Sequence, residues 1–92
     1  IKKMKIKLEL FGASRDFTDK DHLELYLKDK ASIDDLRNEI IKYINKNFQG
    51  NKNFIKVVKS SAFCSENNEI ISDNYKITKD QKIGIIPPIG GG

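Results

Sequence analysis

The chain has 92 residues and a mass of 10.5 kDa, the size of one small domain. It is 38% hydrophobic and 33% charged, and five Phe and three Tyr are too many aromatic residues for a disordered chain. Four of its lysines lie within residues 1–10, whereas a nucleic-acid-binding domain usually spreads basic residues over a face. We therefore expect no nucleic-acid partner, although the net charge is +4.

Two alternating segments open the chain. Apolar and charged residues alternate over 4–10, and leucines recur at every second position over 23–27. Such a period of two predicts half-buried strands. A turn-rich connector from Gly12 to Asp21 separates them, so we expect a hairpin with a long connection.

An amphipathic helix follows. Ser32 is a suitable N-cap, and Asp34 and Asp35 supply acidic residues for the first turn. Gly50 is a natural stop. Apolar residues at spacings of three and four form the buried stripe, namely Ile33, Leu36, Ile40, Ile44 and Phe48.

The second half is less regular. Residues 51–61 fit a short helical turn or a strand, and the sequence leaves both open. We expect strands at 62–65, 70–71 and 82–86, with turns at 66–69 and 78–81. Pro87 and Pro88 end the last strand, because proline has no N–H for the ladder.

This order predicts an α+β domain over residues 1–86 and an extended tail over 87–92. A single main helix must cross one face of a mixed sheet of four to five strands. The first and last strands are the most aliphatic, so we place them side by side in the centre. That arrangement is the β-grasp, or ubiquitin-like, architecture.

The common catalytic constellations are missing. His22 is the only histidine and lies on the outward face of a predicted strand, and Cys64 is the only cysteine. One cysteine excludes an internal disulfide and a cysteine-based zinc cluster, and we expect no metal site. No apolar run approaches 18 residues, so we expect no membrane partner and a cytoplasmic location.

The C-terminus carries a more specific signal. After a predicted core strand the chain reads Pro87, Pro88, Ile89, Gly90, Gly91 and Gly92. Six extended residues reach about 20 Å, and glycines lack the Cβ that blocks a narrow channel. A flexible tail is the simpler interpretation, but this one is suited to insertion into a partner, with the Gly92 carboxylate as the reactive group.

Two segments resemble one family. Residues 10–16 (LFGASRD) and 77–92 (ITKDQKIGIIPPIGGG) are similar to the small subunit of molybdopterin synthase, a ubiquitin-like sulfur carrier. The resemblance runs from Met4 to Gly92. Asp80-Gln81 replaces the usual Gly-Asp, so we expect a different turn there, and 45–59 is longer and richer in Asn and Lys than the family pattern.

The resemblance implies a function. An adenylating enzyme would use ATP to convert the Gly92 carboxylate to an acyl-adenylate, and a sulfur donor protein would displace AMP to leave a thiocarboxylate. The large synthase subunit would transfer this sulfur to cyclic pyranopterin monophosphate, forming the molybdopterin dithiolene. No cofactor would be bound permanently. The catalytic residues of this sulfurtransferase would lie in the large subunit, within a heterotetramer.

By the same resemblance Phe11 and Arg15 lie near the tail and contact partners. Core packing of Phe11 and a solvated Arg15 are the alternatives. Pro87, Pro88, Ile89, Gly90 and Gly91 would form the partner-binding tail. Three other functions stay open: sulfur carriage for thiamine or tRNA thiolation, protein modification, and nucleic-acid binding without sulfur chemistry.

Overall fold

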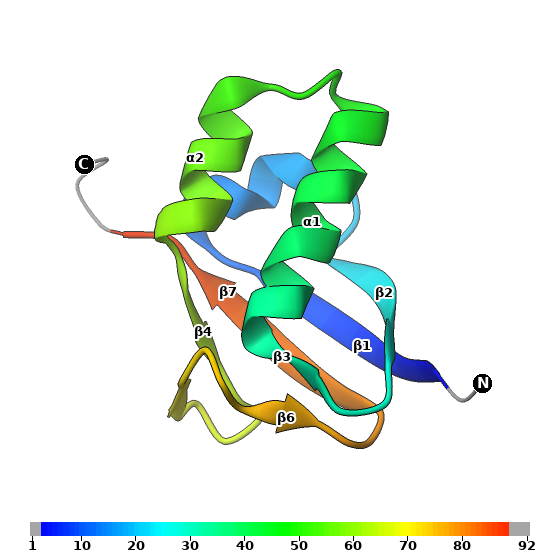
Figure 1. The fold of residues 1–92 in the computed structure, drawn as a ribbon. Coiled ribbons are helices and arrows are strands. Elements are labelled where there is room, and N and C mark those ends of the chain that lie inside the picture. Colours follow the sequence, from blue (N-terminus) through cyan, green and yellow to red (C-terminus); the bar gives the residue numbers. More distant parts are fainter. Residues whose placement is uncertain (1–2, 89–92) are drawn as a thin grey trace.

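The computed structural model describes residues 3–88. Helix α1 crosses one face of a twisted sheet, and a second helix, α2, lies beside it (Figure 1). In chain order the elements are β1 (Lys3–Leu10), the 3-10 helix η1 (Gly12–Phe17), β2 (His22–Lys28), β3 (Ala31–Ser32), α1 (Ile33–Asn47), α2 (Lys52–Ser60), β4 (Ala62–Cys64), β5 (Ile70–Ile71), β6 (Lys76–Ile77) and β7 (Gln81–Ile86).

The main sheet has five strands in the order β2-β1-β7-β4-β5. The central pair, β1 and β7, is parallel and places Leu8 opposite Ile83. The other three pairings of this sheet are antiparallel, and β1 and β2 form the expected hairpin. The predicted α+β β-grasp fold is therefore confirmed, including the central position of the first and last long strands.

The core lies between this sheet and the two helices. Alternate residues of β1 are buried, as the period of two predicted, and they face the buried stripe of α1. Twelve large side chains are less than 2% exposed: Phe17, Phe63, Met4, Ile6, Leu8, Ile33, Leu36, Ile40, Ile44, Ile77, Ile83 and Ile85. The stripe ends one turn early, because α1 stops at Asn47 and Phe48 is its half-buried C-cap.

Helix α1 begins at the predicted cap. The backbone N–H of Asp35 donates to Ser32 Oγ at 3.1 Å, and the N–H of Ser32 donates to Asp35 Oδ2 at 2.9 Å. These reciprocal bonds satisfy two N–H groups that a helix start leaves free. The bond from the Ser32 backbone, with smaller contributions from Lys76 and Lys28, lowers the pKa of Asp35 below its usual value.

Residues 52–60 form a second helix, which settles the ambiguity of this stretch. Asn51 Oδ1 accepts from the backbone N–H groups of Asn53 and Phe54, at 2.9 and 3.2 Å, and so caps α2. The Phe54 ring lies 5.0 Å from that of Phe48 and 5.2 Å from that of Phe17, measured between centroids. These contacts fix α2 to the end of α1 and to η1.

Two further differences concern the short elements. The sequence did not predict β3 and β6, which pair only with each other and have two residues each. The turn before β7 needs no glycine, because Asp80 is not among the described residues with a positive φ. Its side chain instead accepts a hydrogen bond from the Lys5 backbone N–H at 2.8 Å, beside the start of β7.

Candidate functional site

The root of the tail is built into the domain. β7 leads directly to Pro87, which is buried, whereas Pro88 is exposed. Gly12, at the start of η1, has a φ of +56°, and a Cβ added there would lie 3.8 Å from Pro87 Cγ and Cδ. The backbone of η1 therefore packs closely over the Pro87 ring and sets the direction in which the chain leaves the sheet.

The distal part of the predicted site lies beyond this root. Ile89, Gly90, Gly91 and Gly92 fall outside the described residues. Their predicted roles in insertion and sulfur loading remain predictions. What the structure does place is the point from which they extend, between η1 and the end of α2 (Figure 1).

Phe11 lies on the face of the sheet opposite the helices. The core side of β7 is filled by Ile83 and Ile85, so Gly84 faces the other way. A Cβ on Gly84 would lie 2.8 Å from Phe11 Cε2 and 2.8 Å from Cys64 Sγ. Because Gly84 has no side chain, the Phe11 ring can occupy the space above it. Even so, 41% of Phe11 remains exposed.

An apolar strip continues from Phe11 across this open face. The strand register places Gly84, Cys64 and Ile70 in one row across three strands, β7, β4 and β5. Ile70 is 68% exposed, the largest exposed fraction among the large hydrophobic side chains described. The sequence analysis did not single out Ile70, although one of two adjacent isoleucines in a strand must face away from the core.

A buried serine holds Phe11 in position. Ser14 Oγ donates to the Phe11 carbonyl oxygen at 2.6 Å and accepts from the Phe11 N–H at 3.0 Å. Ser14 is completely buried. It was not among the predicted site residues, because its role depends on the 3-10 turn of η1, which the sequence did not reveal.

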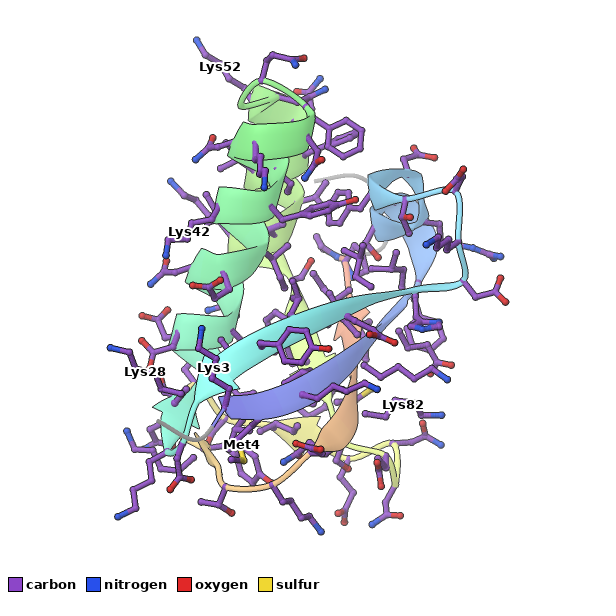
Figure 2. All side chains as sticks on the ribbon, turned by 90° about the vertical axis from the view of Figure 1, so that its right-hand side faces the viewer. Lys3, Met4, Lys28, Lys42, Lys52 and Lys82 are labelled. Atoms are coloured by element: carbon purple, nitrogen blue, oxygen red, sulfur yellow. The ribbon has the colours of Figure 1, made fainter. Side chains whose placement is uncertain are left out.

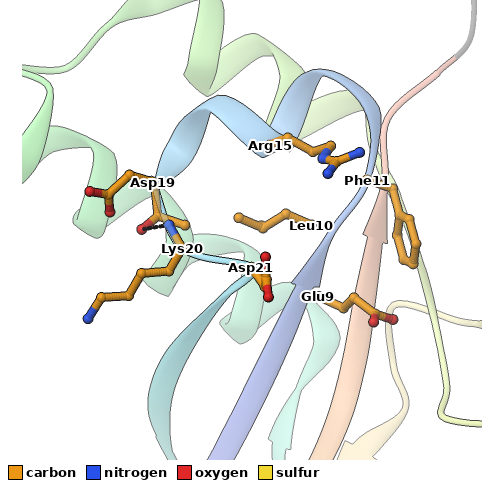
Figure 3. A pocket seen from close by; sticks show the side chains of 8 residues that line it. Glu9, Leu10, Phe11, Arg15, Asp19, Lys20 and Asp21 are labelled. Carbon is orange, nitrogen blue, oxygen red and sulfur yellow. Dashed lines mark hydrogen bonds between the residues drawn. The ribbon is translucent and has the colours of Figure 1, made fainter.

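Arg15 is exposed on η1 and borders a hollow of about 490 Å³. Figure 3 shows its guanidinium extending along η1 toward the Phe11 side of the hollow. Arg15 forms no ion pair within residues 3–88. The hollow is lined by Glu9, Leu10, Phe11, Arg15, Thr18, Asp19, Lys20 and Asp21.

The remaining candidates have structural roles. Cys64 is 6% exposed, and its thiol packs beside Gly84 under Phe11. His22 is half-buried at the start of β2 and pairs with Glu9 across the strands. Among residues 3–88, no three His, Cys, Asp or Glu side chains are grouped so that they could hold a metal ion. No helix in this range is long and apolar enough to cross a membrane.

Comparison with known families settles the class of protein. The model of the ThiS family matches residues 8–92, which includes the end of β1, every later element and the tail sequence. The chain belongs to the ThiS family. It is a ubiquitin-like sulfur carrier, a small protein that is not a catalyst by itself. ThiS family carriers are thiocarboxylated by way of an adenylate, and the family implies an adenylating partner enzyme of the ubiquitin-activating type.

Solved structures agree with this ThiS family fold. A candidate molybdopterin converting factor, subunit 1, of Pyrococcus furiosus has a TM-score of 0.68 and 20% identity, and the match covers 94% of this chain and 99% of that one. SAMP1 from Haloferax volcanii has a TM-score of 0.65 and 12% identity, with 96% and 99% covered. Caldiarchaeum subterraneum ubiquitin has a TM-score of 0.61 and 16% identity, with 99% and 100% covered.

No curated protein matches the sequence of this ThiS family member. At these identities the structural matches show the fold alone, and the family model shows sulfur carriage. The sulfur-carrier part of the predicted resemblance is therefore confirmed. The molybdopterin branch of that resemblance is the finer assignment, and it is taken up as a proposal.

Proposed function

We propose that this carrier is the small subunit of a molybdopterin synthase and that it carries sulfur on the carboxylate of Gly92. One observation carries the proposal: the central strand leads into a Pro87-Pro88 pair whose first ring packs against Gly12, and glycines follow it in the sequence. Prolines limit the conformational freedom that a tail loses when it docks. The Pro-Pro pair before the glycines favours the pterin branch over the thiamine and tRNA branches.

The loading chemistry has two steps. A Gly92 carboxylate oxygen attacks the α-phosphate of ATP and releases pyrophosphate. The product is an acyl-adenylate, in which AMP is a good leaving group on the Gly92 carbonyl carbon. Hydrosulfide then adds to that carbon, AMP departs and the proton on sulfur is lost, leaving a thiocarboxylate. Its sulfur is ionised at neutral pH and is a soft nucleophile, as thiolates are.

Delivery would take place inside the large subunit of a heterotetramer. The thiocarboxylate sulfur forms a C–S bond to a side-chain carbon of cyclic pyranopterin monophosphate while a C–O bond at that carbon breaks and its oxygen leaves. Water then hydrolyses the resulting thioester between Gly92 and sulfur, which leaves the sulfur on the pterin and regenerates the Gly92 carboxylate. Two such transfers supply both sulfurs of the dithiolene. Phe11 is exposed, and Arg15 forms no ion pair among residues 3–88. Both flank Gly12, which packs against Pro87, and from there they would contact both partners in turn.

Intact-mass spectrometry tests the loading step. The full chain is incubated with the purified adenylating enzyme of the same organism, MgATP and sulfide. We expect the mass gain of one oxygen-to-sulfur exchange, mapped to Gly92. The chain without Gly91 and Gly92 should not gain this mass, and its circular dichroism spectrum and unfolding midpoint should match those of the full chain.

Cys64→Ser is the matched control, because it removes the only thiol and keeps the tail. It should load sulfur as the full chain does. Failure of the wild-type chain to load, or loading on Cys64, would contradict the proposal.

The acceptor decides the branch. When the loaded carrier is mixed with the large subunit and cyclic pyranopterin monophosphate, the extra mass should disappear as dithiolene forms. Sulfur delivered instead to a thiazole precursor or to tRNA, or an isopeptide bond to a lysine, would assign the chain to another branch.

A further inference from the structure

One part of the chain is strongly basic. Residues 40–65 contain five lysines and no acidic residue, a charge of +5, so the rest of the chain has a net charge of −1. The five are Lys42, Lys46, Lys52, Lys56 and Lys59. The excess of positive charge at residues 1–10 is offset by acidic residues elsewhere in the chain. The positive charge of residues 40–65, by contrast, is concentrated in the helical layer that contains α2.

Three of these lysines share one exposed face of α2. The spacings from Lys52 to Lys56 and from Lys56 to Lys59 are four and three residues, which place all three on the same side of a helix. Together with Ile55 they line a shallow hollow of about 310 Å³. We call these four residues the α2 basic face.

The lysines of the α2 basic face lack acidic partners. Lys42 of α1 lies 3.1 Å from Glu39, but Lys52, Lys56 and Lys59 form no ion pair within the described part of the chain. Figure 2 shows Lys52 beyond the helical end of the molecule, far from Lys3 and Lys28. The apolar side of α2 is already occupied by its contacts with α1 and η1, so this charged side is the one left to solvent.

The α2 basic face adjoins the root of the tail. A second hollow, of about 250 Å³, is lined by Ala13, Asn53, Lys56, Val57, Ser60, Pro87 and Pro88. Lys56 therefore borders both hollows. Any enzyme that encloses residues beyond Pro88 must bring the rim of its channel close to Lys56.

We propose that the α2 basic face docks onto a carboxylate-rich rim around the channel that receives the tail in the adenylating enzyme. The proposal rests on the proposed function, because it assumes that the tail enters that enzyme. Complementary charge at such a rim would steer the carrier into place and raise the association rate by about 10- to 1,000-fold at low ionic strength. The face has no exposed aromatic ring on which a nucleic-acid base could stack, which disfavours single-stranded nucleic acid as its target.

Charge reversal tests this docking. The triple variant Lys52→Glu, Lys56→Glu, Lys59→Glu is compared with Lys3→Glu, Lys28→Glu, Lys79→Glu, which has the same net charge but alters other surfaces. The measurement is kcat/KM for carrier-dependent pyrophosphate release from MgATP by the adenylating enzyme. We expect a fall of about tenfold or more for the α2 variant at low salt, shrinking as ionic strength rises to ~0.3 M, and a change below about twofold for the control.

A neutral triple variant, Lys52→Gln, Lys56→Gln, Lys59→Gln, controls for misfolding of the glutamate variant. It should show a smaller fall in kcat/KM and an unchanged circular dichroism spectrum. If both α2 variants keep the wild-type kcat/KM and salt dependence, the docking proposal is wrong, although the carrier function stands. If wild-type chain supports no pyrophosphate release, the proposed function itself fails. Salt-sensitive binding to generic RNA that the α2 variants lose, with adenylation unchanged, would also overturn the docking proposal.

Discussion

At the scale of single residues, Gly84 connects the fold to the surface around the tail. It occupies a position in the central strand where an L side chain would collide with Phe11 and Cys64. The Phe11 ring therefore lies close to the backbone at Gly84, next to the buried Cys64, and remains partly exposed. One absent side chain thus shapes the apolar strip beside the root of the tail.

Gly84→Ala should therefore destabilise the chain by about 1–3 kcal/mol, because a methyl group must displace well-packed neighbours. Urea denaturation monitored by circular dichroism measures this loss. In a Phe11→Ala background the same substitution should cost less, since one of the two clashing groups is gone. An equal cost in both backgrounds would show that Phe11 does not occupy the space above Gly84.

At the scale of elements, the start of α1 depends on a reciprocal pair of bonds between Ser32 and Asp35. Because the pKa of Asp35 is lower in the folded chain than in the unfolded one, its ionised form stabilises the fold. That stability is fully present above the unfolded pKa of about 3.9 and is lost as pH falls through the lower folded pKa.

Asp35→Asn should remove this pH dependence while it keeps an oxygen that can accept from Ser32. We expect the wild-type chain to be more stable than the variant above about pH 5, with the difference shrinking as pH falls through about 4 and below. Urea titrations at several pH values test this. A difference that is constant with pH would mean that the Asp35 charge does not support the cap.

Helix α2 depends on aromatic contacts more than on its own length of nine residues, because isolated helices this short are unstable in water. Phe54 joins it to Phe17 and Phe48. Phe54→Ala should destabilise the chain by about 2–4 kcal/mol, toward the lower part of the range for phenylalanine because the side chain is only half-buried.

In the Phe54→Ala variant, the amide hydrogens of α2 should lose protection from hydrogen exchange and be less protected than those of β1 and β7. Lys52→Ala, on the exposed side of the same helix, should change stability by less than about 0.5 kcal/mol. Unchanged protection of α2 in the Phe54 variant would show that other contacts hold the helix in place.

At the scale of the whole molecule, the features that could be predicted from the sequence are those that depend on the local residue pattern. The alternation in β1, the cap at Ser32 and the stripe of α1 each depend on neighbours in the sequence, and all are present, the stripe as far as Ile44. Residues 51–61 did not follow one period, because the two pairs of adjacent apolar residues in α2 suit a helix and a strand equally. The packing of Phe54 against Phe48 and against Phe17, which is far away in the sequence, favours the helix.

The candidate site also has a part that could be predicted from the sequence and a part that could not. The tail and its proline root were evident from the order of residues alone. The seat of Phe11 depends on Gly84, and the hollow at Lys56 depends on α2 lying beside Pro87. Both contacts join segments that are far apart in the sequence and could be recognised only once the strand order was known.

The parallel pairing of β1 with β7 also means that the sheet cannot be completed before β7 has been synthesised. Each pair of opposed residues is separated by 75 positions, so synthesis of the strand that leads into the tail follows long after that of its central partner. Until then β1 presents a free edge, and such edges promote aggregation. Lys3, Lys5 and Lys7 place a positive charge at every second residue of that edge, the pattern by which unpaired strands repel one another. We therefore expect these charges to limit self-association of the nascent chain until β7 is available to complete the sheet.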